Sequence, residues 1–515
     1  MTVNECLKKI SDKISASDKI AFVSAFVCGL LIHMPAMLMD VPNHDGLSSM
    51  YFSQNMITSG RWFLAAVCAV SSFYTVPWII GLIGLLELAL TAVLLKRIFE
   101  IENGITIFVI SGLLVAFPSL ASTFAYVFTL DGYMAGLFLS VLAVYLAKKG
   151  HFILGGIALA FSLGTYQAYL PFAMLLSIYL VWEKMASGEK NGIRKCLEYV
   201  YMGMIGAVLY LVLLKVLLAI EGKVLDTYQG IDNLENAGLS GRISSLPHLY
   251  KDFAGFIFSK GFLTGNACAV AGGVLAVCAA VSALYLVVKN SLYKKAWFYF
   301  VALITAVLVP FSANVVLMIT PDVKYHLIMR YQYVLFMIVC AVLCDKCVGK
   351  LDGAKGKTLL SWLGTLSAIS VIIAYAVTDN IGYTNLQRKY EKTYAYSLRL
   401  LDRIEQTPGY YQGVPVAIMG VIGDDEYPRT DITAPVTDEM IGLGGEYEYL
   451  LYSADNYEAF IKYYMGATLN FVPEEKEAEI YYSDEYIAME SFPGETSVQM
   501  VDGIIYVKTE DALRD

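Results

Sequence analysis

Charged residues are scarce in this sequence, and that scarcity excludes an ordinary water-soluble fold. Only 16% of its 515 residues are Asp, Glu, Lys or Arg, whereas 57% are hydrophobic. The mean hydropathy is +0.57. A soluble domain has no interior large enough for so much apolar surface, so part of that surface must face lipid. The sequence therefore predicts an integral membrane protein.

The sequence also lacks the short motifs of several enzyme classes. It contains no GxxxxGK[ST], no GxSxG and no HExxH, which removes support for nucleotide-driven transport and for the common soluble hydrolases. Three of the five His, at positions 44, 248 and 326, fall in predicted outer loops without the spacing of zinc ligands. We expect no bound metal or other cofactor to be required, although Asp45 and Asp131 could hold a divalent cation.

Cysteine is missing from residue 378 onward, so the C-terminal part has no disulfide framework. Cys344 and Cys347 form a CxxC pair without a second pair nearby, and we interpret them as ordinary thiols. The nine Cys are at positions 6, 28, 68, 196, 268, 278, 340, 344 and 347.

Apolar runs dominate the first three quarters of the chain. A helix rises about 1.5 Å per residue and the hydrocarbon core is roughly 30 Å thick, so a run of about twenty apolar residues can cross once. The apolar stretch 62–73 adjoins the second run without a polar break, and we interpret it as an interfacial or re-entrant segment. The eleven predicted spans are residues 20–39, 75–95, 105–117, 132–147, 152–165, 168–182, 199–220, 268–288, 297–319, 331–343 and 359–377.

Lys and Arg predict the orientation of these spans. Nineteen of them lie in the N-terminal segment and in the connections on its side of the membrane, against seven in the longer loops on the other side. Because positively charged connections stay in the cytoplasm, the N-terminus is expected inside and the C-terminus outside. The first apolar run has no small-residue cleavage site, so we expect a retained span rather than a signal peptide.

The spans divide the chain into two predicted domains. Residues 1–377 form the membrane domain, with long outer loops at 40–61, 118–131 and 221–267. Residues 378–515 form an extracytoplasmic domain that has 26 Asp and Glu against 10 Lys and Arg. Such an acidic surface does not suit nucleic acid.

Hydrophobic periodicity predicts a small α/β fold for the outer domain and an amphipathic helix at 45–59 in the first outer loop. The elements expected in the outer domain are helices at 382–404 and 456–464 and strands at 414–422, 487–492 and 504–508.

Two carboxylates at the outer ends of spans are candidates for catalysis. Asp45 follows the first span in the sequence Asn43-His44-Asp45, and Asp131 opens the fourth. A carboxylate placed there can act as a general base toward a hydroxyl group. Either residue can instead be a helix N-cap, for which Asp is well suited.

Several cationic and polar side chains on the same face could bind a substrate. Arg61 and Arg330, with Lys324, could hold a phosphate, which a guanidinium binds in a bidentate manner, or they could extend to lipid headgroups. Gln167 suits sugar recognition beside aromatic rings, whereas Tyr side chains here could simply form the interfacial belt. The candidates for sugar or acceptor binding are His44, Tyr133, Tyr166, Gln167 and His326.

These residues occur in short motifs that together resemble a known family. The pattern is similar to the glucosyl transferase II family of Gtr-type O-antigen modifying enzymes, within the GT-C superfamily of polyprenyl-phosphate-sugar transferases. The matching motifs are Asn43-His44-Asp45, Gly60-Arg61-Trp62, Leu130-Asp131-Gly132-Tyr133, Thr165-Tyr166-Gln167-Ala168-Tyr169, Arg330-Tyr331, Ser491-Phe492-Pro493-Gly494 and Val501-Asp502-Gly503-Ile504-Ile505.

The resemblance implies a polytopic α-helical, GT-C-like fold and an inverting hexosyltransferase of the plasma or inner membrane. Its donor would be a polyprenyl phosphate sugar, with glucose as the sugar, and its acceptor a hydroxyl of a cell-surface glycan on the outer face. The acidic residue of the first outer loop, here Asp45, would be the base, with Asp131 as a second acidic residue. The alternatives are a lipid or polysaccharide flippase and a surface scaffold protein.

Overall fold

A computed structural model of the chain describes most of its residues. The described residues are 2–5, 9, 13–68, 71, 75–187, 192–226, 239–258, 266–320, 323–422, 440–443 and 449–509.

Each of the eleven predicted spans contains a helix in the structure. By length and composition, eight helices of the described residues can cross a membrane, or nine if the bent pair α6–α7 counts as one span. The structure thus supports a multi-pass helical protein, and the count of eleven stays a prediction. The helices are α2 (Ala16–Leu38), α5 (Pro77–Phe99), α6 (Gly104–Ala116), α8 (Leu130–Lys148), α9 (Phe152–Thr165), α10 (Leu170–Ser187), α11 (Gly192–Glu221), α15 (Asn266–Lys289), α16 (Ala296–Ala313), α18 (Val334–Lys350) and α19 (Ala354–Glu405).

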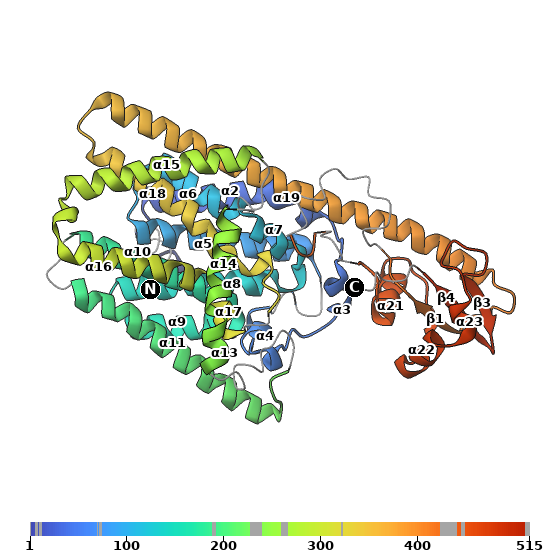
Figure 1. The fold of residues 1–515 in the computed structure, drawn as a ribbon. Helices are drawn as coiled ribbons and strands as arrows, with labels where there is room; N and C mark the ends of the chain where they lie inside the picture. The colour runs from blue at the N-terminus through green and yellow to red at the C-terminus, as the bar shows by residue number, and fades with distance from the viewer. Residues whose placement is uncertain are drawn as a thin grey trace.

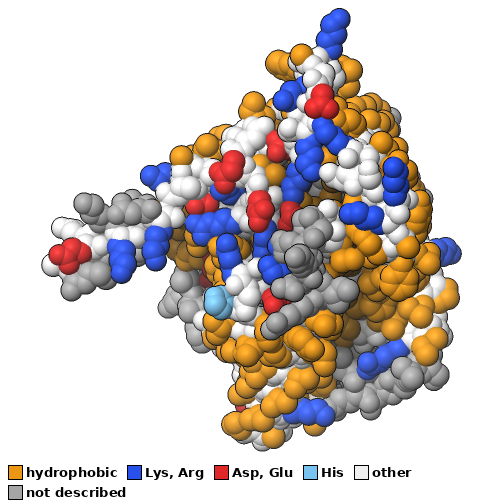
Figure 2. Space-filling view, turned by 90° about the vertical axis from the view of Figure 1, so that its left-hand side faces the viewer, with side chains coloured by type: hydrophobic (Ala, Val, Ile, Leu, Met, Phe, Trp, Pro, Cys, Tyr) orange, Lys and Arg blue, Asp and Glu red, His pale blue; other side chains and the backbone are white. Residues whose placement is uncertain are grey.

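One end of the bundle carries ion pairs between helices. Arg97 of α5 binds Asp18 of α2 at 2.8 Å, and Lys346 of α18 binds Glu183 of α10 at 2.5 Å. Lys148 of α8 adds a contact of 2.8 Å with Glu100. Figure 2 views this end, where Lys and Arg side chains gather with carboxylates inside a rim of hydrophobic side chains. All these residues fall on the predicted inner side, so the structure groups them as the charge pattern does.

The opposite end is built from short helices between the spans. A 45° bend separates α6 from α7 (Pro118–Ala125), and α13 and α14 lie across the long helices (Figure 1). The other short elements of this end are α3 (His44–Ser48), η1 (Ile57–Ser59), α4 (Leu64–Val67), η2 (Val127–Thr129), η3 (Gln167–Tyr169), α13 (Leu239–Ser244), α14 (Leu246–Phe258), α17 (Val316–Ile319), η7 (Leu327–Met329) and η8 (Tyr331–Tyr333). One further short element, η6 (Leu292–Lys294), joins α15 to α16 at the end with the ion pairs.

The predicted amphipathic helix at 45–59 is wrong. Its place is taken by the five-residue helix α3, an irregular stretch and η1. Tyr51 and Gln54 adopt positive φ values of 60° and 55°, which no right-handed helix accommodates. Leu47 packs into the C-terminal domain instead of facing lipid.

Among the described residues of the segment 62–73, which are 62–68 and 71, the helix is α4, four residues long. A Cβ on Gly132 of α8 would clash with the Cys68 sulfur, so α4 packs directly on α8.

Helix α19 joins the two predicted domains without a break. The predicted span 359–377 and the predicted helix 382–404 are parts of one helix of 52 residues, about 80 Å long at the usual rise per residue. The sequence Thr378-Asp379-Asn380-Ile381 between them holds neither Pro nor Gly, so nothing interrupts the hydrogen bonding. In Figure 1 α19 runs from the bundle to the C-terminal sheet.

The C-terminal domain is a small four-stranded sheet with helices. The strand order is β2-β1-β4-β3, with β1 parallel to β2 and β4, and β3 antiparallel to β4. The predicted strand 487–492 is wrong, because Ser483 caps a short helix that ends at Ile487. The elements are β1 (Pro415–Met419), α21 (Ala454–Tyr463), β2 (Asn470–Phe471), α22 (Glu474–Tyr481), α23 (Asp484–Ile487), β3 (Val498–Val501) and β4 (Ile504–Lys508).

Candidate functional site

Arg61 lies at the end of a tight turn, on the end of the bundle opposite the ion pairs. The turn is formed by η1 and by Gly60, whose φ of 76° is left-handed and suits glycine. Two side chains from distant helices hold it: Gln167 Nε2 donates to the Ser59 carbonyl at 3.1 Å, and the Tyr210 hydroxyl donates to the Gly60 carbonyl at 3.2 Å. The backbone around Arg61 is thus fixed by contacts with the η3 and α11 regions.

Aromatic rings surround the Arg61 guanidinium. The Arg61 Nη1 donates to the Tyr133 hydroxyl at 3.1 Å, and the Arg61 Cζ lies 5.1 Å from the centre of the Tyr166 ring. The Tyr133 and Tyr166 rings stack 4.4 Å apart. Three predicted binding residues, from the turn after η1, from α8 and from the end of α9, therefore meet, and Gln167 is tied to the same turn.

A cavity of about 200 Å³ begins at this turn. Arg61, Tyr166 and Gln167 form part of its lining, and the rest is mostly apolar. The apolar side chains come from α9, α10, α11, α17 and the segment that follows α17, and they include Leu163, Leu170, Ala207, Leu211, Val316 and Ile319. The cavity thus offers a cation at one edge and hydrocarbon along its walls.

Asp45 lies beside the loop that precedes α18. Burial, together with the charges of Lys324 and Arg330, lowers the pKa of His326 in this loop to about 4, and only the Asp45 charge opposes that shift. Asp45 also lies 3.5 Å from His44 Nε2, and 44% of its side chain is exposed. Asp45 and His326 are therefore close enough for the charge of one to influence the other, although about 280 residues separate them in the chain.

Asp45 is not the N-cap of its helix. Asn43 takes that position, because its Oδ1 accepts the Gly46 amide hydrogen at 2.7 Å while its Nδ2 donates to the Ala125 carbonyl. The Asp45 carboxylate is therefore not engaged in capping and remains exposed. The alternative prediction that Asp45 serves as a cap is wrong.

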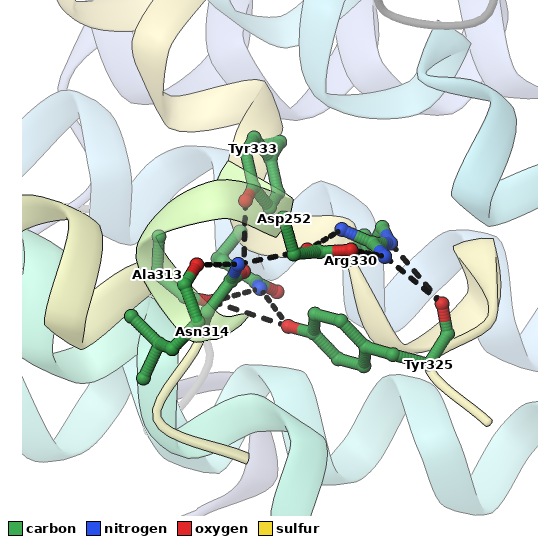
Figure 3. A network of polar contacts seen from close by, with 8 residues as sticks. Asp252, Ala313, Asn314, Tyr325, Arg330 and Tyr333 are labelled. Atoms are coloured by element: carbon green, nitrogen blue, oxygen red, sulfur yellow. Dashed lines mark hydrogen bonds and ion pairs between the residues drawn. The ribbon is translucent and has the colours of Figure 1, made fainter. Parts of the chain in front are cut away.

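Arg330 forms an ion pair that the sequence did not reveal. Its guanidinium donates to both carboxylate oxygens of Asp252, at 2.6 and 2.9 Å, and to the Tyr325 carbonyl (Figure 3). It also lies over the rings of Tyr325 and Phe256, at 4.2 and 4.8 Å. Arg330 is buried, with only 6% of its surface exposed. Its contacts with Asp252 and Tyr325 join α14 to the loop before α18.

The Arg330–Asp252 pair extends into a wider network. Asn314, at the end of α16, donates to Asp252 at 2.8 Å and accepts from the Tyr333 hydroxyl at 2.8 Å. Gln332 donates to the Ala313 carbonyl at 2.6 Å. Figure 3 shows these groups pointing toward one another from α14, α16 and the loop before α18. The network holds α14 across the ends of two long helices.

Asp131 is buried and hydrogen-bonded, whereas Lys324 is exposed. Asp131 is 2% exposed and accepts hydrogen bonds from the Ser71 hydroxyl and from the amide of Gly132. Thr129, not Asp131, occupies the N-cap of α8. Lys324 is exposed and contributes its charge to the surroundings of His326.

Two further residues of the site went unnoticed in the sequence. Asp252 lies in a long loop with no motif around it, and Asn456 lies in the C-terminal domain, from which its Nδ2 donates to the His44 carbonyl at 3.2 Å. No sequence motif marks either residue, because each binds a residue far away in the chain.

No group of three or more His, Cys, Asp or Glu suited to a metal ion occurs among the described residues. The expectation that no metal is required stays a prediction, as does a cation held jointly by Asp45 and Asp131.

Comparison with known proteins gives one match. A family model described as glucosyl transferase GtrII matches residues 34–344, which is more than half of the chain and includes every candidate site residue predicted from the sequence. No curated protein and no solved structure matches.

Proposed function

We propose that this chain, which belongs to the glucosyl transferase GtrII family, moves glucose from a polyprenyl phosphate donor to a hydroxyl of a cell-surface glycan. The protein is a glycosyltransferase with several membrane-spanning helices. The observation that carries the finer proposal is the position of Arg61 at the edge of an apolar cavity, on the same end of the bundle as the exposed carboxylate of Asp45.

The cavity suits a lipid-linked donor. Its aliphatic walls on α11 and α17 would contact the isoprenoid chain near the phosphate, while Arg61 would bind the phosphate oxygens. Lys324 is exposed near the same loop and would add a second positive charge. Arg330 is committed to Asp252, so we assign it the role of holding α14 and the loop in place rather than of binding phosphate.

Asp45 would act as the base. In a single displacement, the acceptor oxygen forms a bond to the anomeric carbon while the bond from that carbon to the phosphate oxygen breaks. The acceptor proton passes to Asp45, the electron pair leaves with the polyprenyl phosphate, and the anomeric configuration inverts. Positive charge at the departing phosphate lowers the barrier, and one such contact typically contributes roughly 3 to 4 kcal/mol. Neutralisation by Arg61 and Lys324 makes a metal ion unnecessary in this scheme.

The aromatic and amide groups around Arg61 would shape the sugar subsite. Tyr133 and Tyr166 present stacked rings, and His44 and His326 lie on the side of Asp45. Gln167 uses its amide nitrogen to support the Arg61 turn, which leaves its amide oxygen as the group for sugar recognition.

The test is consumption of polyprenyl phosphate glucose by the purified protein with a glycan acceptor. We expect Asp45→Asn to lower kcat by about 100-fold or more, because general base catalysis contributes about 10²- to 10⁴-fold. Asp484→Asn is the matched control, since Asp484 also lies in the first turn of a short helix but in the C-terminal domain. Full activity of Asp45→Asn would remove Asp45 from the mechanism, and movement of labelled lipid without covalent transfer would favour a flippase.

A further inference from the structure

The helix that carries Asp45 lies against the C-terminal domain. Asn456 of α21 donates through Nδ2 to the His44 carbonyl at 3.2 Å and to the Ser48 hydroxyl at 2.8 Å. Its Oδ1 lies 3.0 Å from the Ser453 hydroxyl, and the side chain is 0% exposed. One amide thus contacts the first and the last residue of α3.

A residue of α3 also completes the core of the C-terminal domain. Leu47 is 2% exposed and belongs to the same cluster as Phe460 of α21 and Leu400 of α19. The membrane bundle contributes its own cluster, which does not contain Leu47. The helix with Asp45 is therefore packed as part of the C-terminal domain, although it belongs to the first outer loop.

Contacts on both sides of α3 strengthen this docking. Before it, the Tyr464 hydroxyl lies 3.4 Å from Asp40 Oδ1, and after it the rings of Tyr51 and Tyr463 lie 5.3 Å apart. The ring of His44 lies 5.7 Å from that of Tyr452. Segment 40–51 and the face of α21 thus run side by side over their length.

A short segment of the C-terminal domain packs into the membrane bundle beside α3. Met440 and Leu443 are 0% exposed and belong to the bundle's hydrophobic core. A Cβ added to Gly442, between them, would lie 2.9 Å from the amide nitrogen of Asn43, the N-cap of α3. The C-terminal domain therefore contacts the start of α3 as well as the face of α3 that carries Leu47.

We infer that the C-terminal domain holds Asp45 in place and that Asn456 is a positioning residue for the transfer reaction. A helix of five residues is not stable by itself, because nucleation is costly. The amide of Asn456 binds both ends of α3, at the His44 carbonyl, one residue before Asp45, and at the Ser48 hydroxyl. The inference rests on the proposed function, since it assumes that Asp45 is the base.

The kinetic test compares three single variants and one double variant. Asn456→Ala is expected to lower kcat by about 10-fold or more with the donor KM changed less than 2-fold, because small displacements of a catalytic group are costly. Ser48→Ala removes the contact between Ser48 and Asn456 from the α3 side, without changing a residue of the C-terminal domain. The double variant should be no slower than Asn456→Ala, because both changes remove one shared contact.

Asn470→Ala is the control. Asn470 is an exposed residue of the same domain, and its amide donates to the Gly413 carbonyl rather than to α3. It should keep the wild-type kcat. Losses that multiply in the Ser48 and Asn456 double variant, or an Asn456→Ala enzyme of normal kcat, would overturn the inference.

Amide hydrogen exchange of the peptide 43–49 in the full-length protein gives a readout that needs no reaction. Asn456→Ala should speed exchange there by about 10-fold, while peptides of the C-terminal sheet keep their protection and so show that the domain is folded. Unchanged exchange at 43–49 would overturn the positioning role. If the wild-type protein transfers no sugar but Asn456→Ala still speeds exchange at 43–49, the proposed function alone is refuted.

Discussion

At the scale of single residues, His326 shows how the surroundings of a side chain change its pKa. Burial lowers its pKa to about 4, and the nearby charges of Lys324 and Arg330 act in the same direction. It is therefore a neutral imidazole at physiological pH, able to donate one hydrogen bond and accept another. A neutral ring can contact a sugar hydroxyl without competing with Arg61 for the donor phosphate.

This predicts a pH dependence of stability. An unfolded His titrates near pH 6.5, whereas His326 in the folded protein titrates near pH 4. Between these values the unfolded chain binds a proton that the folded chain does not, so stability should fall as pH drops from about 6.5 toward about 4.

The His326→Gln variant should lose part of that dependence, which thermal unfolding in detergent at pH 7 and pH 5 would measure. The His151→Gln variant is the control, because His151 is exposed at the opposite end of the bundle. Equal losses of unfolding temperature in the wild-type and His326→Gln proteins would contradict the prediction.

At the scale of elements, an ion pair helps to hold α14 across the bundle. Arg330 and Asp252 have side chains that are 7% and 22% exposed, and Asp252 also binds Asn314 of α16. Removing one member of a buried pair leaves the other charge without its partner, which typically costs more than the pair itself contributes. Helix α14 and the loop before α18 should therefore loosen together when the pair is broken.

We predict that Asp252→Ala lowers the free energy of unfolding by about 3 kcal/mol. Adding Arg330→Leu should restore part of that loss, because the unpaired charge disappears. Denaturant unfolding in detergent, with Lys251→Ala as an exposed control on the same helix, measures both effects. A double variant less stable than Asp252→Ala would show that Arg330 contributes chiefly through other contacts.

At the scale of the whole molecule, the two ends of the bundle differ in chemistry. One end carries the ion pairs of Lys148 and Lys346, and the other carries α3, which contains Asp45, and the C-terminal sheet (Figure 1). Helix α19 passes from the bundle into that domain, so the C-terminal sheet and the candidate site must face the same side of the membrane.

This arrangement predicts the result of a labelling experiment. In intact cells, a membrane-impermeant maleimide should label a Tyr482→Cys protein, since Tyr482 is 77% exposed in the C-terminal domain. A Lys149→Cys protein should be labelled only after the cells are permeabilised. Labelling of the unsubstituted protein measures the background from its own thiols. Labelling of Lys149→Cys in intact cells, with Tyr482→Cys labelled only after permeabilisation, would place the candidate site in the cytoplasm.

The sequence by itself determined the helices of the membrane part. An apolar run in lipid can satisfy its backbone only by internal hydrogen bonds, so hydropathy predicts a helix without knowledge of neighbours. Strand 504–508 was also predicted correctly, because its alternation and flanking turn are local. The motifs around Arg61 and Tyr166 were sufficient to indicate the family, which the family model confirms.

Only the tertiary structure decided which side chains meet. Arg61 with Tyr133, Arg330 with Asp252 and Asn456 with His44 are pairs separated by 72, 78 and 412 positions, and no local pattern encodes such contacts. The same reason explains the failed helix at 45–59, where burial of Leu47 in a distant domain outweighed its helical spacing. Local hydrogen bonding fixes elements, whereas the choice of partners depends on how distant elements pack.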